Sequence, residues 1–194
     1  MAHKSVFISG FGPFEKVTHN SSGVLAAALE ADPPPGVSVQ SQLLPVSFDR
    51  SREVLEEALA GHRPSLLVGL GEQPKEGFRL ELRAARGSAE STRPDVDGVP
   101  AGHSGWSLEP GLRWRGDLWT SLELPLARFV RGRRGWMRSA VAGSYVCERV
   151  FRQLLEMGTE RGVPAIFVHL PPLAACPREL QLRELQTLLL ELDF

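Results

Sequence analysis

Two side chains in the second half of the sequence have the chemistry of a nucleophile and of a base. Cys147 follows the turn-forming residues AGSY at the start of an amphipathic segment. With Ser144 as the N-cap, Cys147 is the third residue of a helix, where unpaired amides and the helix dipole favour a thiolate. His169 ends the apolar segment AIFVH and precedes two prolines. An imidazole there suits general acid and base chemistry on a thiol.

Each of these residues also has a plain structural interpretation. A cysteine standing alone is more often a small buried hydrophobic residue, and a lone histidine at a strand end is more often structural. A Cys–His pair further needs a third group that orients the imidazole. Glu81, in FRLELRAA, is a candidate. Its alternation with Arg79 and Arg83 equally fits an exposed strand carboxylate paired with arginine.

An aromatic loop, GFGPF at residues 10–14, follows the first apolar segment. Glycine permits a tight backbone path and Pro13 fixes one φ angle, so the loop is rigid. Two interpretations stay open: Phe11 and Phe14 either cap the core or form the wall of a pocket for a small flat ligand. A phosphate cradle is disfavoured, because neither GxGxxG nor GxxxxGK[ST] is present.

Composition narrows the function classes. The chain has 194 residues, 42% hydrophobic content and a formal charge of −1, so we expect one domain over residues 1–194 with a sizeable core. The charge argues against nucleic acid as a partner. Neither a membrane-spanning run nor a signal peptide is recognisable, and we expect a cytoplasmic protein.

Metal binding and a disulfide framework are both disfavoured. The five histidines show no paired spacing, and two cysteines are too few for a framework. Cys176 stands at the start of a predicted helix, where it is structural or incidental, although a helix N-terminus also activates thiols.

The elements that must position these residues alternate along the chain. Ser21 and Ser22 are the expected N-caps of the first helix. Buried strands separated by helices predict an α/β fold, a three-layer α/β/α sandwich with a mostly parallel, twisted central sheet. In such sheets, sites form at the carboxyl ends of strands. We expect strands at residues 5–9, 37–45, 65–70, 78–85, 138–142 and 165–169. We expect helices at residues 23–31, 124–131, 145–158 and 177–193, and a further helix that begins at residue 51. Residues 86–116 form a polar, glycine-rich region.

Three motifs, in this order, resemble those of the pyroglutamyl peptidases (pyrrolidone-carboxylate peptidases), a family of cytosolic cysteine peptidases. They are GFGPF with Asn20 six residues after its last phenylalanine, AGSYVC, and FVHLP. The resemblance extends over nearly the whole chain. It implies that Cys147 is the nucleophile, His169 the base and acid, and Glu81 the carboxylate that orients the imidazole, in a hydrolysis that proceeds through a thioester.

The resemblance also implies a substrate, a peptide or small amide with an N-terminal pyroglutamate. Phe11 and Phe14 would sandwich the lactam ring, and Asn20, Glu72 and Arg93 match further positions of the site. Such acyl transfer requires no metal and no cofactor. The family further implies a homo-oligomer, a dimer or a tetramer.

Several residues depart from the family's pattern. Leu82 stands in place of an arginine, Glu148 of an asparagine, Ser21 of a proline and Glu72 of a glutamine. Glu148 adds negative charge beside the thiol, which opposes the helix dipole. Three hypotheses therefore remain. The first is a cysteine peptidase for pyroglutamyl peptides, and the second is a catalytically weakened or inactive homologue that binds a small lactam-like or acyl-amide ligand. The third is a structural or phosphate-binding domain.

Overall fold

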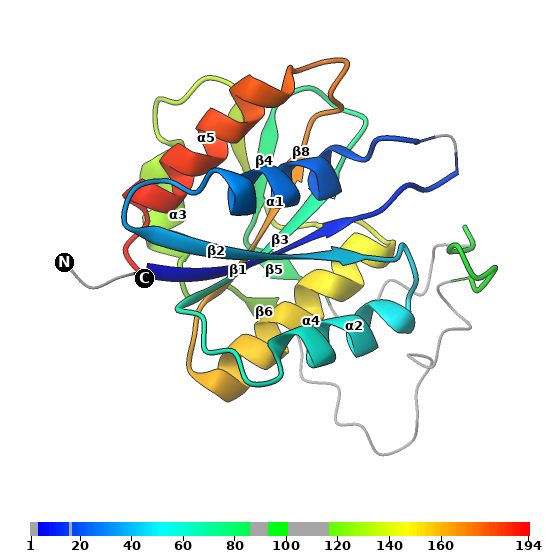
Figure 1. The fold of residues 1–194 in the computed structure, drawn as a ribbon. Coiled ribbons are helices and arrows are strands. Elements are labelled where there is room, and N and C mark those ends of the chain that lie inside the picture. The colour runs from blue at the N-terminus through cyan, green and yellow to red at the C-terminus, as the bar shows by residue number, and fades with distance from the viewer. Residues whose placement is uncertain (1–3, 16, 86–92, 101–116) are drawn as a thin grey trace.

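A six-stranded sheet forms the middle layer of the fold in the computed structural model, which describes residues 4–15, 17–85, 93–100 and 117–194 (Figure 1). The strands lie in the order β2-β1-β3-β8-β4-β7, and β5 and β6 form a separate two-stranded sheet. Their bounds are β1 Lys4–Phe11, β2 Val37–Leu44, β3 Leu66–Glu72, β4 Phe78–Glu81, β5 Arg83–Ala84, β6 Leu118–Trp119, β7 Trp136–Ser139 and β8 Ala165–Leu170.

Four adjacent strands, β2, β1, β3 and β8, run parallel to one another. β4 pairs antiparallel with β8, and β7 runs parallel to β4. The mostly parallel sheet is thereby confirmed, but the reversal at β4 was not expected. It places the end of β4 beside the middle of β8.

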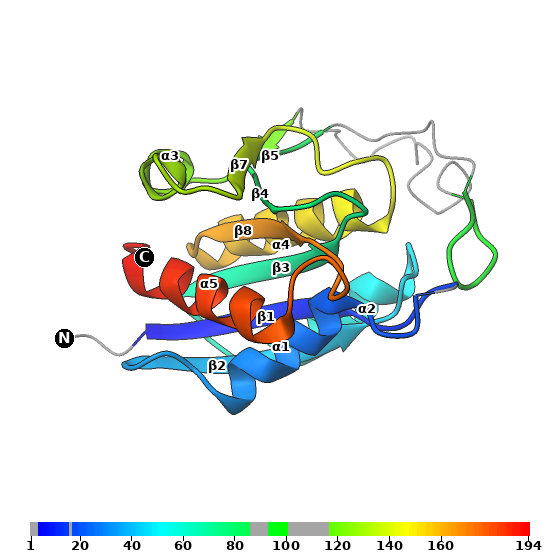
Figure 2. The same cartoon turned by 90° about the horizontal axis from the view of Figure 1, so that it is seen from above.

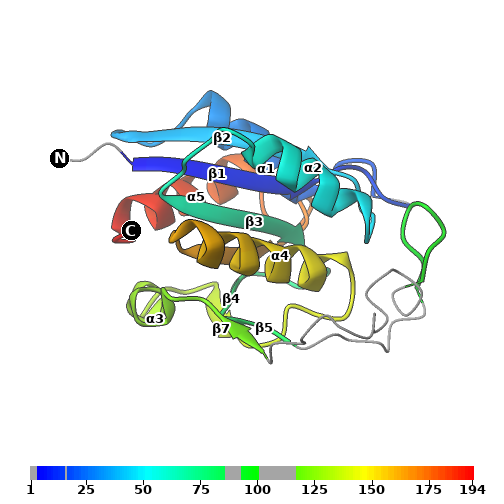
Figure 3. The same ribbon diagram turned by 90° about the horizontal axis from the view of Figure 1, so that it is seen from below.

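Helices cover both faces of the sheet. They are α1 (Ser21–Ala31), α2 (Arg50–Leu59), α3 (Glu123–Val130), α4 (Val146–Arg161) and α5 (Arg178–Glu191). α1 and α5 lie on one face, and α2 and α4 on the other (Figures 2 and 3). This arrangement confirms the three-layer sandwich. None of the helices in the described residues is long and apolar enough to cross a membrane.

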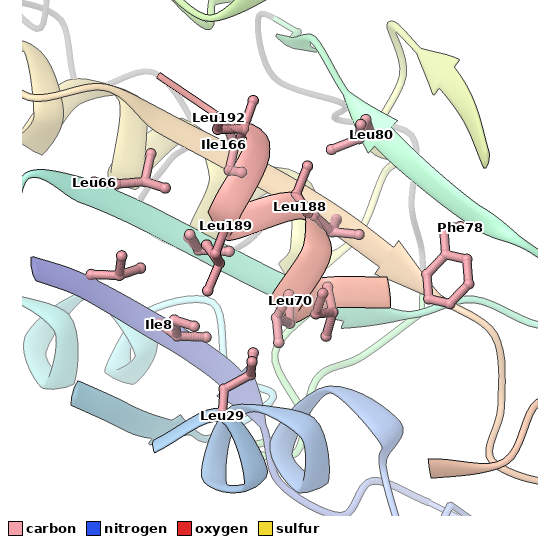
Figure 4. Close-up of a cluster of buried hydrophobic side chains, with 14 of the residues drawn as sticks. Ile8, Leu29, Leu66, Leu70, Phe78, Leu80, Ile166, Leu188, Leu189 and Leu192 are labelled. Carbon is pink, nitrogen blue, oxygen red and sulfur yellow. The ribbon is translucent and has the colours of Figure 1, made fainter. Parts of the chain in front are cut away.

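The core consists of two hydrophobic clusters, one on each face of the sheet. Strand residues alternate between them: Ile166 and Val168 of β8 face α1 and α5, whereas Phe167 faces α4. Figure 4 shows the first cluster, in which Leu29, Leu188 and neighbouring side chains pack on the sheet. Each such buried side chain contributes about 1.5–3 kcal/mol.

Three local predictions differ from the structure. The strand expected over 78–85 is divided into β4 and β5, and the strand expected over 138–142 lies at 136–139. The N-cap of α1 is Asn20, not Ser21 or Ser22, because the side-chain Oδ1 of Asn20 accepts the backbone N–H of Ser22. Of the predicted polar region, only 93–100 lies within the described residues.

Candidate active site

The antiparallel pairing of β4 with β8 places Glu81 and His169 on the same face of the sheet. Arg79 is opposite His169 and Glu81 is opposite Phe167. Directly opposed residues share a face, and diagonal neighbours are within reach of long side chains. Since Phe167 packs in the α4-side cluster, Glu81 and His169 both face α4.

Glu81 accepts a hydrogen bond from the imidazole of His169. The distance from His169 Nδ1 to Glu81 Oε1 is 2.8 Å, and the Glu81 side chain is fully buried. An ionised carboxylate only accepts hydrogen bonds, so the proton belongs on Nδ1 and Nε2 is left for another partner. The alternative of an exposed Glu81 paired only with arginine is therefore wrong.

Cys147 is the second residue of α4. The helix begins at Val146 and its N-cap is Tyr145, not Ser144 as expected. Cys147 therefore lies one position nearer the N-terminus of the helix than predicted. The first turn still offers unpaired amides. A Cβ atom at Gly71 would stand 3.0 Å from the Cys147 sulfur, and Gly71 pairs with His169 across β3 and β8. The sulfur therefore lies against β3, at the residue that pairs with His169 of β8.

The imidazole of His169 interacts electrostatically with the side chain of Cys147. Burial alone would lower the pKa of His169, but hydrogen bonds with Cys147 and Glu81, together with their negative charges, raise this pKa to about 9. The imidazolium is thus the favoured form at neutral pH whenever the sulfur carries a negative charge. A thiol, an imidazole and a carboxyl group from α4, β8 and β4 converge on one face of the sheet.

Arg79 supports the buried carboxylate. Its Nε lies 3.7 Å from Glu81 Oε1, and its Nη2 donates to Ser139 Oγ at 2.6 Å. A guanidinium held at this distance stabilises the charge of Glu81. The sequence pattern had offered a pairing of Glu81 with arginine, but at an exposed strand, whereas here the carboxylate is buried.

The GFGPF loop meets the start of α4 through aromatic rings. The Phe14 and Tyr145 ring centroids are 5.6 Å apart, and the Tyr145 hydroxyl donates to the Pro94 carbonyl at 2.6 Å. The guanidinium of Arg93 lies 4.8 Å from the Phe14 centroid and 5.0 Å from that of Tyr145. Arg93 also pairs with Glu15 at 2.7 Å. These contacts join the loop, residues 93–94 and the N-terminus of α4.

The two phenylalanines of the loop have different surroundings. Phe11 is 3% exposed and belongs to the α4-side core cluster, whereas Phe14 is partly buried at its margin. Phe11 also lines, with Asn20, an apolar groove of about 300 Å³ beside α1. Phe11 therefore caps the core and also borders this groove, whereas Phe14 lies beside the ring of Tyr145. The pairing of the two rings around a ligand stays a prediction.

Asn20 and Glu72 hold the N-terminus of α1. Glu72 Oε2 accepts the backbone N–H of Ser21 at 2.7 Å, and the Asn20 side chain accepts the backbone N–H of Ser22 at 3.1 Å. The Asn20 amide also donates to the carbonyl of Gly12 at 3.3 Å. Asn20 thus fixes the loop against the helix and Glu72 joins the helix to β3, and their contact with a substrate stays a prediction.

Two further residues at the site were missed by the sequence analysis. Gly71 leaves room for the Cys147 sulfur, and the two glycines of GLGE within a strand were the available signal. Tyr145 joins three segments, and burial raises its pKa to about 12. Leu82, in place of the family's arginine, is buried in the α1-side cluster. No group of three or more potential metal-ligating side chains occurs in the described part of the chain.

Comparison with known proteins agrees with the motifs. A family model described as pyroglutamyl peptidase matches residues 4–103. The pyrrolidone-carboxylate peptidase of Bacillus velezensis is 30% identical over 179 residues, which cover 87% of this chain and 78% of the relative.

Solved structures agree with the fold. The pyrrolidone carboxyl peptidase of Fervidobacterium islandicum superposes with a TM-score of 0.77 at 27% identity, covering 96% of each chain. The enzyme of Thermococcus litoralis has a TM-score of 0.82 at 21% identity over 97% of this chain and 92% of its own. With the matching family model and the 30% identical relative, the chain belongs to the pyroglutamyl peptidase family.

Proposed function

We propose that this protein is a cysteine peptidase that hydrolyses the amide bond after an N-terminal pyroglutamyl residue. The observation that carries the proposal is the convergence of Cys147, His169 and Glu81: the imidazole is bonded to the buried carboxylate at 2.8 Å, and the Cys147 sulfur lies against Gly71, the residue that pairs with His169. A base oriented by a third group is what a thiol nucleophile needs.

The acylation step uses the thiol and the imidazole together. Nε2 of His169 takes the proton from Cys147, and the thiolate attacks the pyroglutamyl carbonyl carbon. Backbone amides of the first turn of α4 stabilise the oxyanion. When the tetrahedral intermediate collapses, Nε2 protonates the leaving amine and a thioester remains on the sulfur.

Deacylation reverses the role of the imidazole. His169 removes a proton from water, which attacks the thioester carbonyl, and the proton returns to the sulfur as pyroglutamate leaves. Glu81 holds the Nδ1 proton and stabilises the imidazolium in both steps. No atom of a metal or cofactor enters this sequence.

The substrate side of the proposal rests on the aromatic loop. A lactam ring is uncharged, so it suits an aromatic surface that disfavours a charged amino terminus. We assign this surface to Phe14 and Phe11, bounded by Arg93, whose charge Glu15 balances. Asn20 and Glu72, next to the same loop, are assigned to the polar edge of the lactam.

The second candidate function is a homologue that binds a lactam-like or acyl-amide ligand without turning it over. One observation favours it: Glu148, the residue directly after Cys147 in the first turn of α4, is an acidic residue that is only 5% exposed. A full negative charge there opposes formation of the thiolate.

Fluorophore release from a pyroglutamyl amide tests the first function against the second. We expect release by the wild type, none by Cys147→Ala, and unchanged release by Cys176→Ala, the matched variant of the second thiol. Equal release by Cys147→Ala would remove the proposed nucleophile. No release by any form, combined with slow iodoacetamide labelling of Cys147, would favour the binding protein.

A further inference from the structure

The carboxyl group of Glu148 links two segments of the candidate active site. It follows Cys147 in the first turn of α4, and it is 5% exposed. Its Oε1 accepts a hydrogen bond from the backbone N–H of Ala85, four residues after Glu81. Glu148 therefore ties the helix that carries the thiol to the chain that continues from the carboxylate of the triad.

The second oxygen of this carboxyl group, Oε2, is buried and accepts no hydrogen bond from the described residues. An ionised oxygen in such a position is costly. Burial raises the pKa of Glu148 to about 7, and the charge of Glu81 adds to this, while the amides of Ala85 and Ala142 act against it. The group therefore holds a proton under conditions in which an exposed carboxyl group has lost it.

Charged groups from several elements surround Glu148. Glu81 of β4 disfavours its ionisation and Arg83 of β5 favours it. Arg83 is in turn paired with Asp117. Arg152, one turn along α4, donates to the Ala85 carbonyl at 3.5 Å. Ionisation of Glu148 thus adds a second buried negative charge beside that of Glu81.

We propose that Glu148 is a positioning residue whose ionisation slows the reaction of the Cys147 thiol. With its proton, the side chain is neutral and still accepts the Ala85 amide. When the proton leaves to solvent, the new charge lies one residue from the sulfur and opposes both the thiolate and the oxyanion. The hydrolytic part of this inference rests on the proposed function, whereas the effect on thiol reactivity does not.

Glu148→Gln separates the charge from the hydrogen bond, because its amide oxygen can still accept the Ala85 N–H. The experiment measures the alkylation rate constant of Cys147 by iodoacetamide, resolved from Cys176 by peptide mass spectrometry. The same forms are assayed for hydrolysis of a pyroglutamyl amide. We expect the ratio of the variant's alkylation rate constant to that of the wild type to rise about tenfold between about pH 5.5 and pH 8.5.

A matched variant and two outcomes make this test decisive. Glu160→Gln removes an exposed charge from the far end of the same helix, and its rate ratio should stay constant with pH. An alkylation rate ratio for Glu148→Gln that also stays constant with pH would overturn the inference, even if hydrolysis depends on Cys147. A rising ratio with no hydrolysis by any form would uphold the inference and reject the proposed peptidase.

Discussion

The hydrogen bond between Glu81 and His169 is the most constrained contact at the level of single residues. Glu81 is fully buried, and within the described part of the chain its second oxygen, Oε2, has no hydrogen-bond partner. Burial of a carboxylate with so few partners is unfavourable for folding. Its charge is compensated by the imidazolium of His169 and by Arg79.

Replacement of this carboxylate tests its role in the chemical step. We predict that Glu81→Gln lowers kcat by about 100-fold or more and changes KM little, because an orienting group acts on the imidazole and not on substrate binding. Steady-state kinetics on a pyroglutamyl amide measure both constants. A large change in KM with unchanged kcat would contradict this role.

The hydrogen bond between His169 and Glu81 makes the free energy of unfolding depend on pH. The pKa of His169 is raised from 6.5 to about 9, so its contribution to the free energy of unfolding is complete below about 6.5 and lost as the pH rises through about 9. We predict that wild type loses on the order of 2 kcal/mol more stability than His169→Asn between about pH 6 and pH 10. Urea denaturation at each pH measures this difference. An equal loss of stability by the wild type and by His169→Asn would refute the prediction.

The residue types of the site could be predicted from the sequence, but their burial could not. The motifs placed Cys147 and His169 next to a helix start and a strand end, as the structure has them. For Glu81, the alternating pattern was the same whether its face was covered or exposed. Only the pairing of β4 with β8, which is not visible in sequence, places this residue under α4.

At the level of elements, β1 and α1 approach closely at the GFGPF loop. A Cβ atom at Gly10 would stand 2.2 Å from the backbone carbonyl oxygen of Ser22, whereas one at Gly12 would be 3.7 Å from its nearest neighbour. We predict that Gly10→Ala destabilises the fold by about 3 kcal/mol or more, because backbone must move. Gly12→Ala is the matched variant and should change stability little.

Thermal unfolding followed by circular dichroism measures both glycine variants. A Gly10→Ala protein as stable as Gly12→Ala would show that the approach of β1 to α1 is looser than described. The motif suggested that these glycines permit a tight path, but it did not distinguish them. That distinction arises from the helix packed on β1, a contact between elements that sequence spacing does not reveal.

Helix starts illustrate a second limit of sequence analysis at this scale. Serines were expected as N-caps of α1 and α4, yet Asn20 and Tyr145 occupy these positions. For α1, neighbouring side chains decide the outcome, since Glu72 from β3 already accepts the Ser21 amide. Cap preference is a local rule, and tertiary partners override it.

At the level of the whole molecule, the two core clusters share the strands of one sheet. Alternating strands and helices were sufficient to predict the three layers, but not the reversal at β4 or the small sheet of β5 and β6. The single domain over residues 1–194 and the dimer or tetramer stay predictions. Sedimentation velocity of the full chain measures the assembly directly.

Shared strands should make the two faces unfold together. We predict that Leu154→Ala on α4 and Leu188→Ala on α5, both buried, each destabilise by about 2–5 kcal/mol and shift one common calorimetric transition. Two transitions, of which each variant moves only one, would contradict a single cooperative domain.

The central claim is that the Cys147 thiol forms a covalent bond to the pyroglutamyl group. The most direct measurement is rapid acid quench of the protein with a pyroglutamyl ester, followed by mass spectrometry of the intact chain and its peptides. We predict one added pyroglutamyl group, located at Cys147 and absent from Cys147→Ala. Substrate turnover without any adduct at Cys147, or the same adduct on the Cys147→Ala chain, would contradict the mechanism.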